Sequence, residues 1–233
     1  MNTGRDLLLW LWKRKSQRDL QKTIGASEFG SPCTYCVGQI LLANHKHDGH
    51  SPWWLAARIG TACHLDLQHV AEELLPKSML EHRVYLGELP DYGVISSSLD
   101  YFDPDEGHLV DWKTTERSKL RLYKLIEAVP EPSSIETTEL SEARFTLEKY
   151  VNQGLSYARG LVMAGYEVNR ISLGFVCRDG KTDDDIWSLD FDYDPEQAQR
   201  VWDRLVALWD YLREGGDPEA LNKHPFCKTC SGW

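Results

Sequence analysis

The sequence predicts an α/β fold in which helices cover the faces of a mixed β-sheet. Two observations lead to it: helical segments are followed by three strands, a long helix, two more strands and a last helix, and no repeat interrupts this order. The chain has 233 residues, of which 42% are hydrophobic, and can bury one sizeable core. We therefore expect a single domain, with a helical segment over 1–50, a core over 51–215 and a cysteine-bearing tail over 216–233.

The expected helices follow from apolar residues at helical spacing and from signals at the helix ends. Pro195 marks the start of the last helix, whose apolar side then carries Val201, Leu205 and Leu208. We expect helices over 5–23, from about Cys33, after Pro52, over about 118–128, over about 141–165 and over 195–213.

The expected strands are rich in β-branched and aromatic residues, such as Val84, Tyr85, Val94 and Ile95. The residues from Asp103 to Gly107 form a turn by composition, and they join two strands into a hairpin. We expect strands near 82–87, 93–102, 108–114, 171–177 and 186–191.

Two carboxylates and a lysine share one side of this hairpin. Side chains alternate between the faces of a strand, so Asp111 and Lys113 point the same way. If the turn is centred on Asp105–Glu106, Asp100 lies opposite Asp111 and Ser98 lies opposite Lys113. A loop of odd length would shift this register.

Opposed carboxylates repel unless a positive charge lies between them. Oxygen ligands at this spacing suit Mg²⁺ or Mn²⁺, either of which can polarise a phosphate and activate water. Lys113 could then orient the water or neutralise phosphate charge. The alternative is a solvated acidic hairpin whose Asp and Lys side chains have no chemical role.

Two helical motifs offer further polar side chains. His64 ends the run that begins at Gly60, and it shares a helix face with Gln68 and Glu72. A single helical histidine is more often structural or exposed than a ligand. Gln153 and Tyr157 also lie one helical turn apart, and the alternative for them is simple packing beside the sheet.

Four cysteines form two C-x-x-C pairs near opposite ends of the chain. Cys33 and Cys36 come early, and Cys227 and Cys230 come late, so that one four-thiolate site could join the two ends. Four thiolates select zinc or an iron–sulfur cluster, and spacing does not separate these two. Reduced thiols and disulfides are the alternatives. Cys63 and Cys177 are expected in the core.

Together, these motifs resemble those of the PD-(D/E)XK nucleases. Asp100, ten further residues and then Asp111-Trp112-Lys113 are similar to the signature of that superfamily. The Gly60-to-His64 run and the Gln153-to-Tyr157 run resemble two motifs of its RecB-like branch. The two C-x-x-C pairs, one before the core and one after it, resemble the flanking cysteines of iron–sulfur nucleases in this branch, among them CRISPR-adaptation exonucleases.

The resemblance implies a restriction-endonuclease-like core and a role for each motif residue. It implies that His64, Asp100, Asp111 and the backbone carbonyl of Trp112 bind Mg²⁺ or Mn²⁺. It also implies that Lys113 positions the attacking water. The same resemblance gives Gln153 and Tyr157 a supporting or phosphate-binding role, and favours a structural [4Fe-4S] cluster, with Zn²⁺ as the alternative, on Cys33, Cys36, Cys227 and Cys230.

The chain departs from the family pattern in two places. Ser98 stands where the family often has glycine before the first metal-binding Asp, which adds a hydroxyl and removes no ligand. The cysteines are divided two and two around the core, whereas relatives usually have one before it and three after it. This division keeps zinc open as the metal of the site.

The net charge of −10 is an objection to a nucleic-acid substrate, because non-specific DNA affinity comes largely from Lys and Arg. A nuclease, however, needs only a local basic track, for which 13–18 and 117–124 are candidates. Both runs could equally be solvated helix faces. Base stacking is a further use for Trp53, Trp54 and Trp112, although core packing is more usual.

No apolar run approaches the roughly 20 residues that span a membrane. The apolar run 7–12 is followed by Lys13, Arg14 and Lys15, the reverse of the charge order in a signal peptide. We therefore expect a cytoplasmic protein without a membrane partner.

We expect a DNA exonuclease that acts on single strands or on DNA ends, with a recombination or CRISPR-adaptation protein as a partner. One alternative is a DNA-end binding or adaptor protein that does not cut. A second is a sequence-specific restriction endonuclease, for whose recognition domain this chain has little room.

Overall fold

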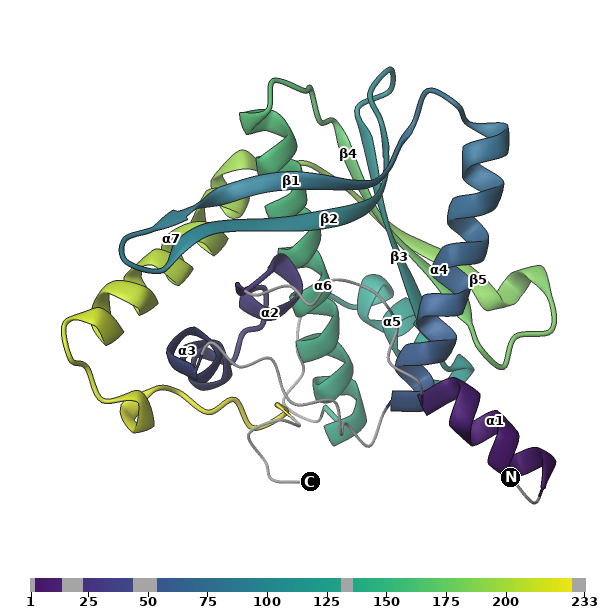
Figure 1. Cartoon of the computed structure of the whole chain (residues 1–233), viewed down its shortest axis with the longest axis horizontal. Helices are drawn as coiled ribbons and strands as arrows, with labels where there is room; N and C mark the ends of the chain where they lie inside the picture. The colour runs from purple at the N-terminus through teal and green to yellow at the C-terminus, as the bar shows by residue number, and fades with distance from the viewer. Residues whose placement is uncertain (1–2, 14–22, 44–53, 131–135, 228–233) are drawn as a thin grey trace.

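The structure, a computed structural model, describes residues 3–13, 23–43, 54–130 and 136–227. Its centre is one five-stranded sheet in the order β1-β2-β3-β4-β5 (Figure 1). The strands are β1 (Met79–Leu89), β2 (Gly93–Asp103), β3 (His108–Thr115), β4 (Arg170–Cys177) and β5 (Ile186–Asp192).

The sheet is mixed, as predicted. β1, β2 and β3 are antiparallel neighbours, β4 runs parallel to β3, and β5 returns antiparallel to β4. A parallel pair needs a long crossover, and here the chain between β3 and β4 forms two helices. The described α-helices are α1 (Gly4–Lys13), α2 (Ala26–Phe29), α3 (Thr34–Ala43), α4 (Trp54–Leu74), α5 (Arg117–Ala128), α6 (Thr138–Met163) and α7 (Pro195–Arg213).

Most expected elements are confirmed to within a few residues of their predicted ends. The helix expected over 118–128 is α5, and the long helix expected over 141–165 is α6, which begins earlier because Thr137 caps it by accepting a bond from the Leu140 N–H. Of the helix expected over 5–23, α1 covers the first part, and 14–22 lie outside the described residues.

Helix α6 organises the core. Leu155, Ala158 and Leu161 are fully buried against the sheet. Gly160 lets α6 approach β1 closely, because a Cβ atom at this position would lie 2.8 Å from the backbone oxygen of Tyr85. Helix α6 therefore lies directly under β1, β3 and β4, where its polar side chains can reach residues of β3.

The hairpin register is correct over part of its length. Tyr101 pairs with Val110 and Phe102 with Leu109, as a turn centred on Asp105–Glu106 requires. The described ladder ends there, because β2 turns away with β1 while β3 follows β4 (Figure 1).

The expected pairing of Ser98 with Lys113 is therefore wrong. Ser98 and Lys113 are not among the described pairs of β2 with β3, and on their other edges Ser98 pairs with Arg83 of β1 and Lys113 with Phe175 of β4. None of the described helices is long and apolar enough to cross a membrane.

Candidate active site

Asp100 lies where β2 and β3 separate, and two groups hold its carboxylate. The backbone N–H of Trp112 donates to Asp100 Oδ2 at 2.7 Å, in place of a ladder bond between the strands. His64 Nδ1 lies 3.3 Å from Asp100 Oδ1. Burial raises the pKa of Asp100, but His64, Lys113 and the Trp112 N–H outweigh burial and lower it.

His64 comes from α4, on the opposite side of β3 from α6. Gly60 lets α4 approach, because a Cβ atom there would lie 3.1 Å from Thr114 Oγ1. One turn later, the imidazole of His64 meets the ring of Trp112 edge-on, with centroids 6.1 Å apart. The hydrogen bond to Asp100 raises the pKa of His64 although burial opposes it.

Asp111 and Lys113 lie on the other face of β3, under α6. Their side chains form an ion pair in which the Asp111 side chain is 2% exposed and that of Lys113 is 13% exposed. Burial raises the pKa of Asp111 to about 6. Burial also acts to lower the pKa of Lys113, but the carboxylates of Asp111 and Asp100 outweigh it and raise that pKa.

Gln153 and Tyr157 extend this ion pair into a chain of hydrogen bonds. Lys113 Nζ donates to Gln153 Oε1 at 3.2 Å, and Gln153 Nε2 donates to the Tyr157 hydroxyl at 2.8 Å. The same amide nitrogen lies 3.5 Å from Asp111 Oδ1. Tyr157 therefore fixes the orientation of the Gln153 amide so that its oxygen faces Lys113.

A cavity of about 850 Å³ adjoins this chain. Tyr150 lines it, and the Tyr150 ring centroid lies 4.9 Å from Lys113 Nζ. Cys36, Cys227 and Lys149 line it as well, so the cavity connects the neighbourhood of Lys113 with the cysteines. Burial lowers the pKa of Lys149.

Glu81 is a residue that the sequence reasoning missed. Ligand atoms of His64, Glu81 and Asp100 all lie within 4.8 Å of one another. The strand predicted over 82–87 begins at Met79, and its ladder pairs Leu80 with Tyr101, so Glu81 lies across from Asp100. The turn between β1 and β2 does not reveal it, because the register shifts by one residue between Tyr85 and Gly87, and pairing continued from Leu89 and Gly93 would put Glu81 opposite Tyr101.

The predicted metal ligands fall into two sets in the described part of the chain. His64 and Asp100 gather with Glu81, whereas the Asp111 carboxylate contacts Lys113 and Gln153. The backbone N–H of Trp112 donates to Asp100, and on the other edge of β3 Trp112 pairs with Gly174 of β4.

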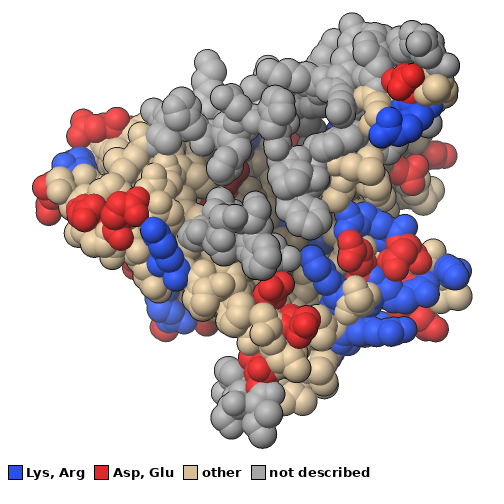
Figure 2. Space-filling view, turned by 90° about the horizontal axis from the view of Figure 1, so that it is seen from below, with Lys and Arg blue, Asp and Glu red and all other residues tan. Residues whose placement is uncertain are grey.

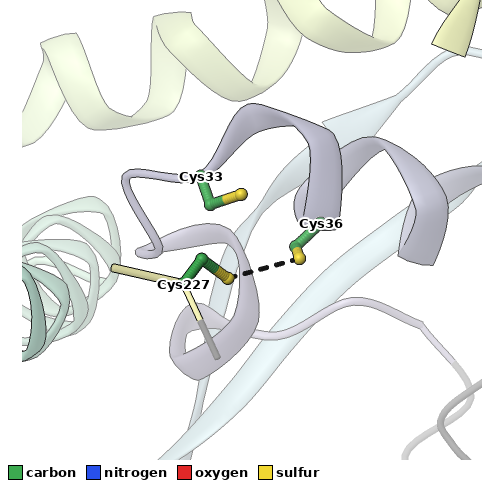
Figure 3. A group of neighbouring side chains, drawn as sticks. All are labelled: Cys33, Cys36 and Cys227. Carbon is green, nitrogen blue, oxygen red and sulfur yellow. Dashed lines mark hydrogen bonds between the residues drawn. The ribbon is translucent and has the colours of Figure 1, made fainter. Parts of the chain in front are cut away.

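Three of the four predicted cysteine ligands lie together (Figure 3). The sulfur atoms of Cys33, Cys36 and Cys227 lie within 4.8 Å of one another, and those of Cys36 and Cys227 are 3.4 Å apart. The His224 N–H lies 3.5 Å from Cys33 Sγ. Cys230 lies outside the described residues.

The other two cysteines differ from each other. Cys177 is buried, as expected. The expectation for Cys63 is wrong, because this side chain is only partly buried on α4.

The second basic run forms α5 but is not a uniform basic surface. Arg117 is paired with Asp185, and Lys124 donates to the backbone oxygen of Asp184. Lys119 and Arg121 are exposed. On the face shown in Figure 2, Lys and Arg side chains gather mainly on the right, where Asp and Glu side chains lie among them. Residues 14–18 of the first basic run and Trp53 lie outside the described residues.

No protein-family model and no curated protein matches the sequence. Several solved structures are similar to the chain. The protein SSO0001 is 14% identical over 89% of this chain and 87% of its own, with a TM-score of 0.50. A phage-related exonuclease from Haemophilus somnus 129PT is 11% identical over 82% of this chain and 95% of its own, with a TM-score of 0.49.

An alkaline exonuclease from Laribacter hongkongensis is 11% identical over 81% of this chain and 94% of its own, with a TM-score of 0.36. At these identities, the likeness to SSO0001 shows that the two chains share a fold.

Proposed function

We propose that the protein is a metal-dependent deoxyribonuclease of the PD-(D/E)XK type, acting as an exonuclease. The observation that carries the proposal is the chain of contacts around β3. On one face, Asp111, Lys113 and Gln153 are linked, and at the edge of the strand Asp100 joins the Trp112 N–H to His64. A solvated acidic hairpin would not bury these charges.

The donor set fits a divalent cation. Imidazole nitrogen and carboxylate oxygen are ligands that Mn²⁺ accepts, and carboxylates and carbonyls suit Mg²⁺. In this proposal His64, Asp100, Asp111 and the Trp112 carbonyl hold Mg²⁺ or Mn²⁺. The bound cation would supply Lewis-acid chemistry at the scissile phosphate.

The side chains under α6 prepare the attack. The Lys113 ammonium is fixed by Asp111 and Gln153, which leaves its remaining N–H to orient a water molecule or a phosphate oxygen. Tyr157 holds the Gln153 amide in the orientation that accepts from Lys113. Lys149 lines the adjoining cavity, and in this proposal its ammonium binds a phosphate of the strand.

The proposed substrate is DNA, as a single strand or at a duplex end, and a recombination or CRISPR-adaptation protein is the proposed partner. Lys119 and Arg121 follow the Lys113 strand and are exposed to such a substrate.

Cleavage of end-labelled DNA tests the activity. Single- and double-stranded DNA, labelled at either end, would be incubated with Mg²⁺, Mn²⁺ or EDTA. We expect stepwise shortening with either cation and none with EDTA. Asp111→Ala and Lys113→Ala should abolish it, whereas Lys77→Ala, which removes an exposed ion pair with Asp105, should not. Retained cleavage in a purified, folded Asp111→Ala or Lys113→Ala protein would reject the assignment.

For the cysteine site we propose a structural [4Fe-4S] cluster on Cys33, Cys36, Cys227 and Cys230. Three thiols that already converge and a sulfur that faces a backbone N–H support a metal–thiolate site. Anaerobic purification, absorption spectroscopy and metal analysis test it. A brown protein with about four irons per chain is expected, and a colourless protein with stoichiometric zinc would replace the cluster by Zn²⁺.

A further inference from the structure

Three neighbouring strands bring acidic residues into one row. The ladder between β1 and β2 pairs Leu80 with Tyr101 and His82 with Leu99, which leaves Glu81 across from Asp100. The ladder between β2 and β3 ends at Tyr101 and Val110, but the Trp112 N–H of β3 binds Asp100, so that Asp111, the preceding residue, lies on the β3 side of Asp100. Asp100 is therefore flanked by a carboxylate from each neighbouring strand.

The Glu81 and Asp100 carboxylates also share the imidazole of His64. The ladder itself skips Glu81, whose φ is +46, so the position of its side chain follows from its own contacts. Oxygen atoms of Glu81 and Asp100 and a ring nitrogen of His64 lie within 4.8 Å of one another. Like charges at this separation repel, and a shared cation would remove the repulsion.

The two carboxylate oxygens of Asp100 have different partners, and only one of them faces His64. The Trp112 N–H binds Asp100 Oδ2, and Oδ1 is the atom 3.3 Å from His64 Nδ1. A cation that replaced the proton between these two atoms would meet an oxygen of Glu81 on its third side. The Asp111 carboxylate, by contrast, is held by Lys113.

We propose that Glu81 is a ligand of the active-site cation, together with His64 and Asp100. This inference rests on the proposed function, to which it adds a ligand from β1. One imidazole and two carboxylates form a donor set that favours Mn²⁺ over Mg²⁺, because imidazole suits transition metals better than it suits Mg²⁺. In this set the preference for Mn²⁺ comes from His64, and Glu81 adds a carboxylate that strengthens binding of the cation.

Metal binding by the purified full-length protein tests the assignment without any nuclease assay. Titration calorimetry with Mn²⁺ and with Mg²⁺ would be run on the wild type, Glu81→Gln and Glu88→Gln. Glu88 lies on the same strand but is exposed, which makes it the matched control. We expect Glu81→Gln to weaken Mn²⁺ binding about 10-fold or more, by analogy with the loss of groups that support metal ligands. Glu88→Gln should bind as the wild type does.

Thermal unfolding in EDTA and in excess Mn²⁺ provides a second readout and shows that each variant folds. We expect Mn²⁺ to raise the Tm of the wild type and of Glu88→Gln, and to raise that of Glu81→Gln much less. Equal Mn²⁺ affinity in Glu81→Gln and the wild type would overturn the assignment of Glu81, and a wild type that binds Mg²⁺ as tightly as Mn²⁺ would overturn the preference ascribed to His64.

The two proposals fail in different ways. If the wild type binds Mn²⁺ through Glu81 but does not cleave DNA, the proposed function is wrong and the metal site stands. If the wild type cleaves DNA and Glu81→Gln binds Mn²⁺ normally, the activity stands and the role of Glu81 is wrong.

Discussion

The ammonium of Lys113 forms an ion pair with the carboxylate of Asp111 on the face of β3 that α6 covers. The two residues are separated by Trp112 alone, so the alternation of a strand places both side chains on that face. The pair is almost fully buried, and the free energy of folding therefore depends on both partners being present.

The first prediction concerns the coupling within this pair. Asp111→Asn and Lys113→Met should each lower the free energy of unfolding by roughly 3–5 kcal/mol, because each leaves one buried charge without its partner. The double variant should lose much less than the sum of the two. Urea unfolding of the four proteins measures the coupling, and additive losses would show that the ion pair contributes nothing specific.

The second prediction concerns Tyr157 as a positioning residue. Tyr157→Phe removes the acceptor of the Gln153 amide, so the amide no longer has one preferred orientation toward Lys113. We expect kcat to fall roughly 10-fold with little change in KM, which corresponds to about 1.4 kcal/mol for a lost buried hydrogen bond. Single-turnover cleavage measures it.

Tyr211→Phe is the matched control for this variant. It likewise deletes a hydrogen-bonded tyrosine hydroxyl, but this one donates to the backbone oxygen of Asp217 at the end of α7. Its kcat should equal that of the wild type. If both variants lose activity equally, or neither does, Tyr157 does not position Gln153.

The third prediction concerns the pH dependence of metal binding. Burial raises the pKa of Asp111 to about 6, and the hydrogen bond to Asp100 raises the pKa of His64 above its ordinary value. Metal binding needs both groups deprotonated. Mn²⁺ affinity should therefore rise as the pH rises through about 6 and continue to rise while His64 loses its proton.

Calorimetry in two buffers of different ionisation enthalpy measures the protons released on binding. At pH values below the pKa of His64, Mn²⁺ should release protons from the protein. Binding that is independent of pH between about pH 5 and about pH 8 would contradict the assignment of both residues as ligands.

The fold could be predicted because its signals are local. Strand alternation and helical spacing gave the elements, and the turn at Asp103 to Gly107 gave the register near its own position. The pairing of Ser98 with Lys113 could not be judged in this way. It depends on how far the ladder between β2 and β3 extends, and this ladder ends at Tyr101 and Val110, where β2 stays with β1 and β3 stays with β4.

The candidate site was predictable where one element carries two of its residues. Asp111 and Lys113 share a strand, and Gln153 and Tyr157 share a helix face. The structure brings these four into one network. Glu81 was missed because the residue across from it, Asp100, is set by the register shift between Tyr85 and Gly87, which the turn at the end of β1 does not reveal.

The fourth prediction concerns Gly87, where the register of β1 shifts against β2. A Cβ atom there would lie 2.2 Å from the Trp202 ring, and the residue has φ +147. Gly87→Ala should therefore lose roughly 2–4 kcal/mol of folding free energy, from strain and overpacking together. Gly93→Ala is the control, because Gly93 has φ +104 but nothing within 4 Å of its Cβ position.

Denaturant unfolding of both glycine variants measures the difference. Gly93→Ala reports backbone strain alone and should lose roughly 1 kcal/mol. Equal losses in the two variants would mean that the Trp202 ring moves aside without cost.

The fifth prediction concerns the cysteine group as a clamp between the chain ends. Cys36 Sγ and Cys227 Sγ are in contact across 191 positions of sequence, and the backbone oxygen of Asn222 accepts the N–H of Tyr35. Cys227→Ser should therefore release the bound metal, lower the Tm and expose the tail after α7 to protease, because metal–thiolate binding contributes directly to folding. Cys63→Ser, which changes a partly buried thiol outside this group, should keep metal content, Tm and protease resistance.

Metal analysis, thermal unfolding and limited proteolysis of the two variants measure these changes. A Cys227→Ser protein with full metal content and an unchanged Tm would show that the three neighbouring thiols are ordinary core residues.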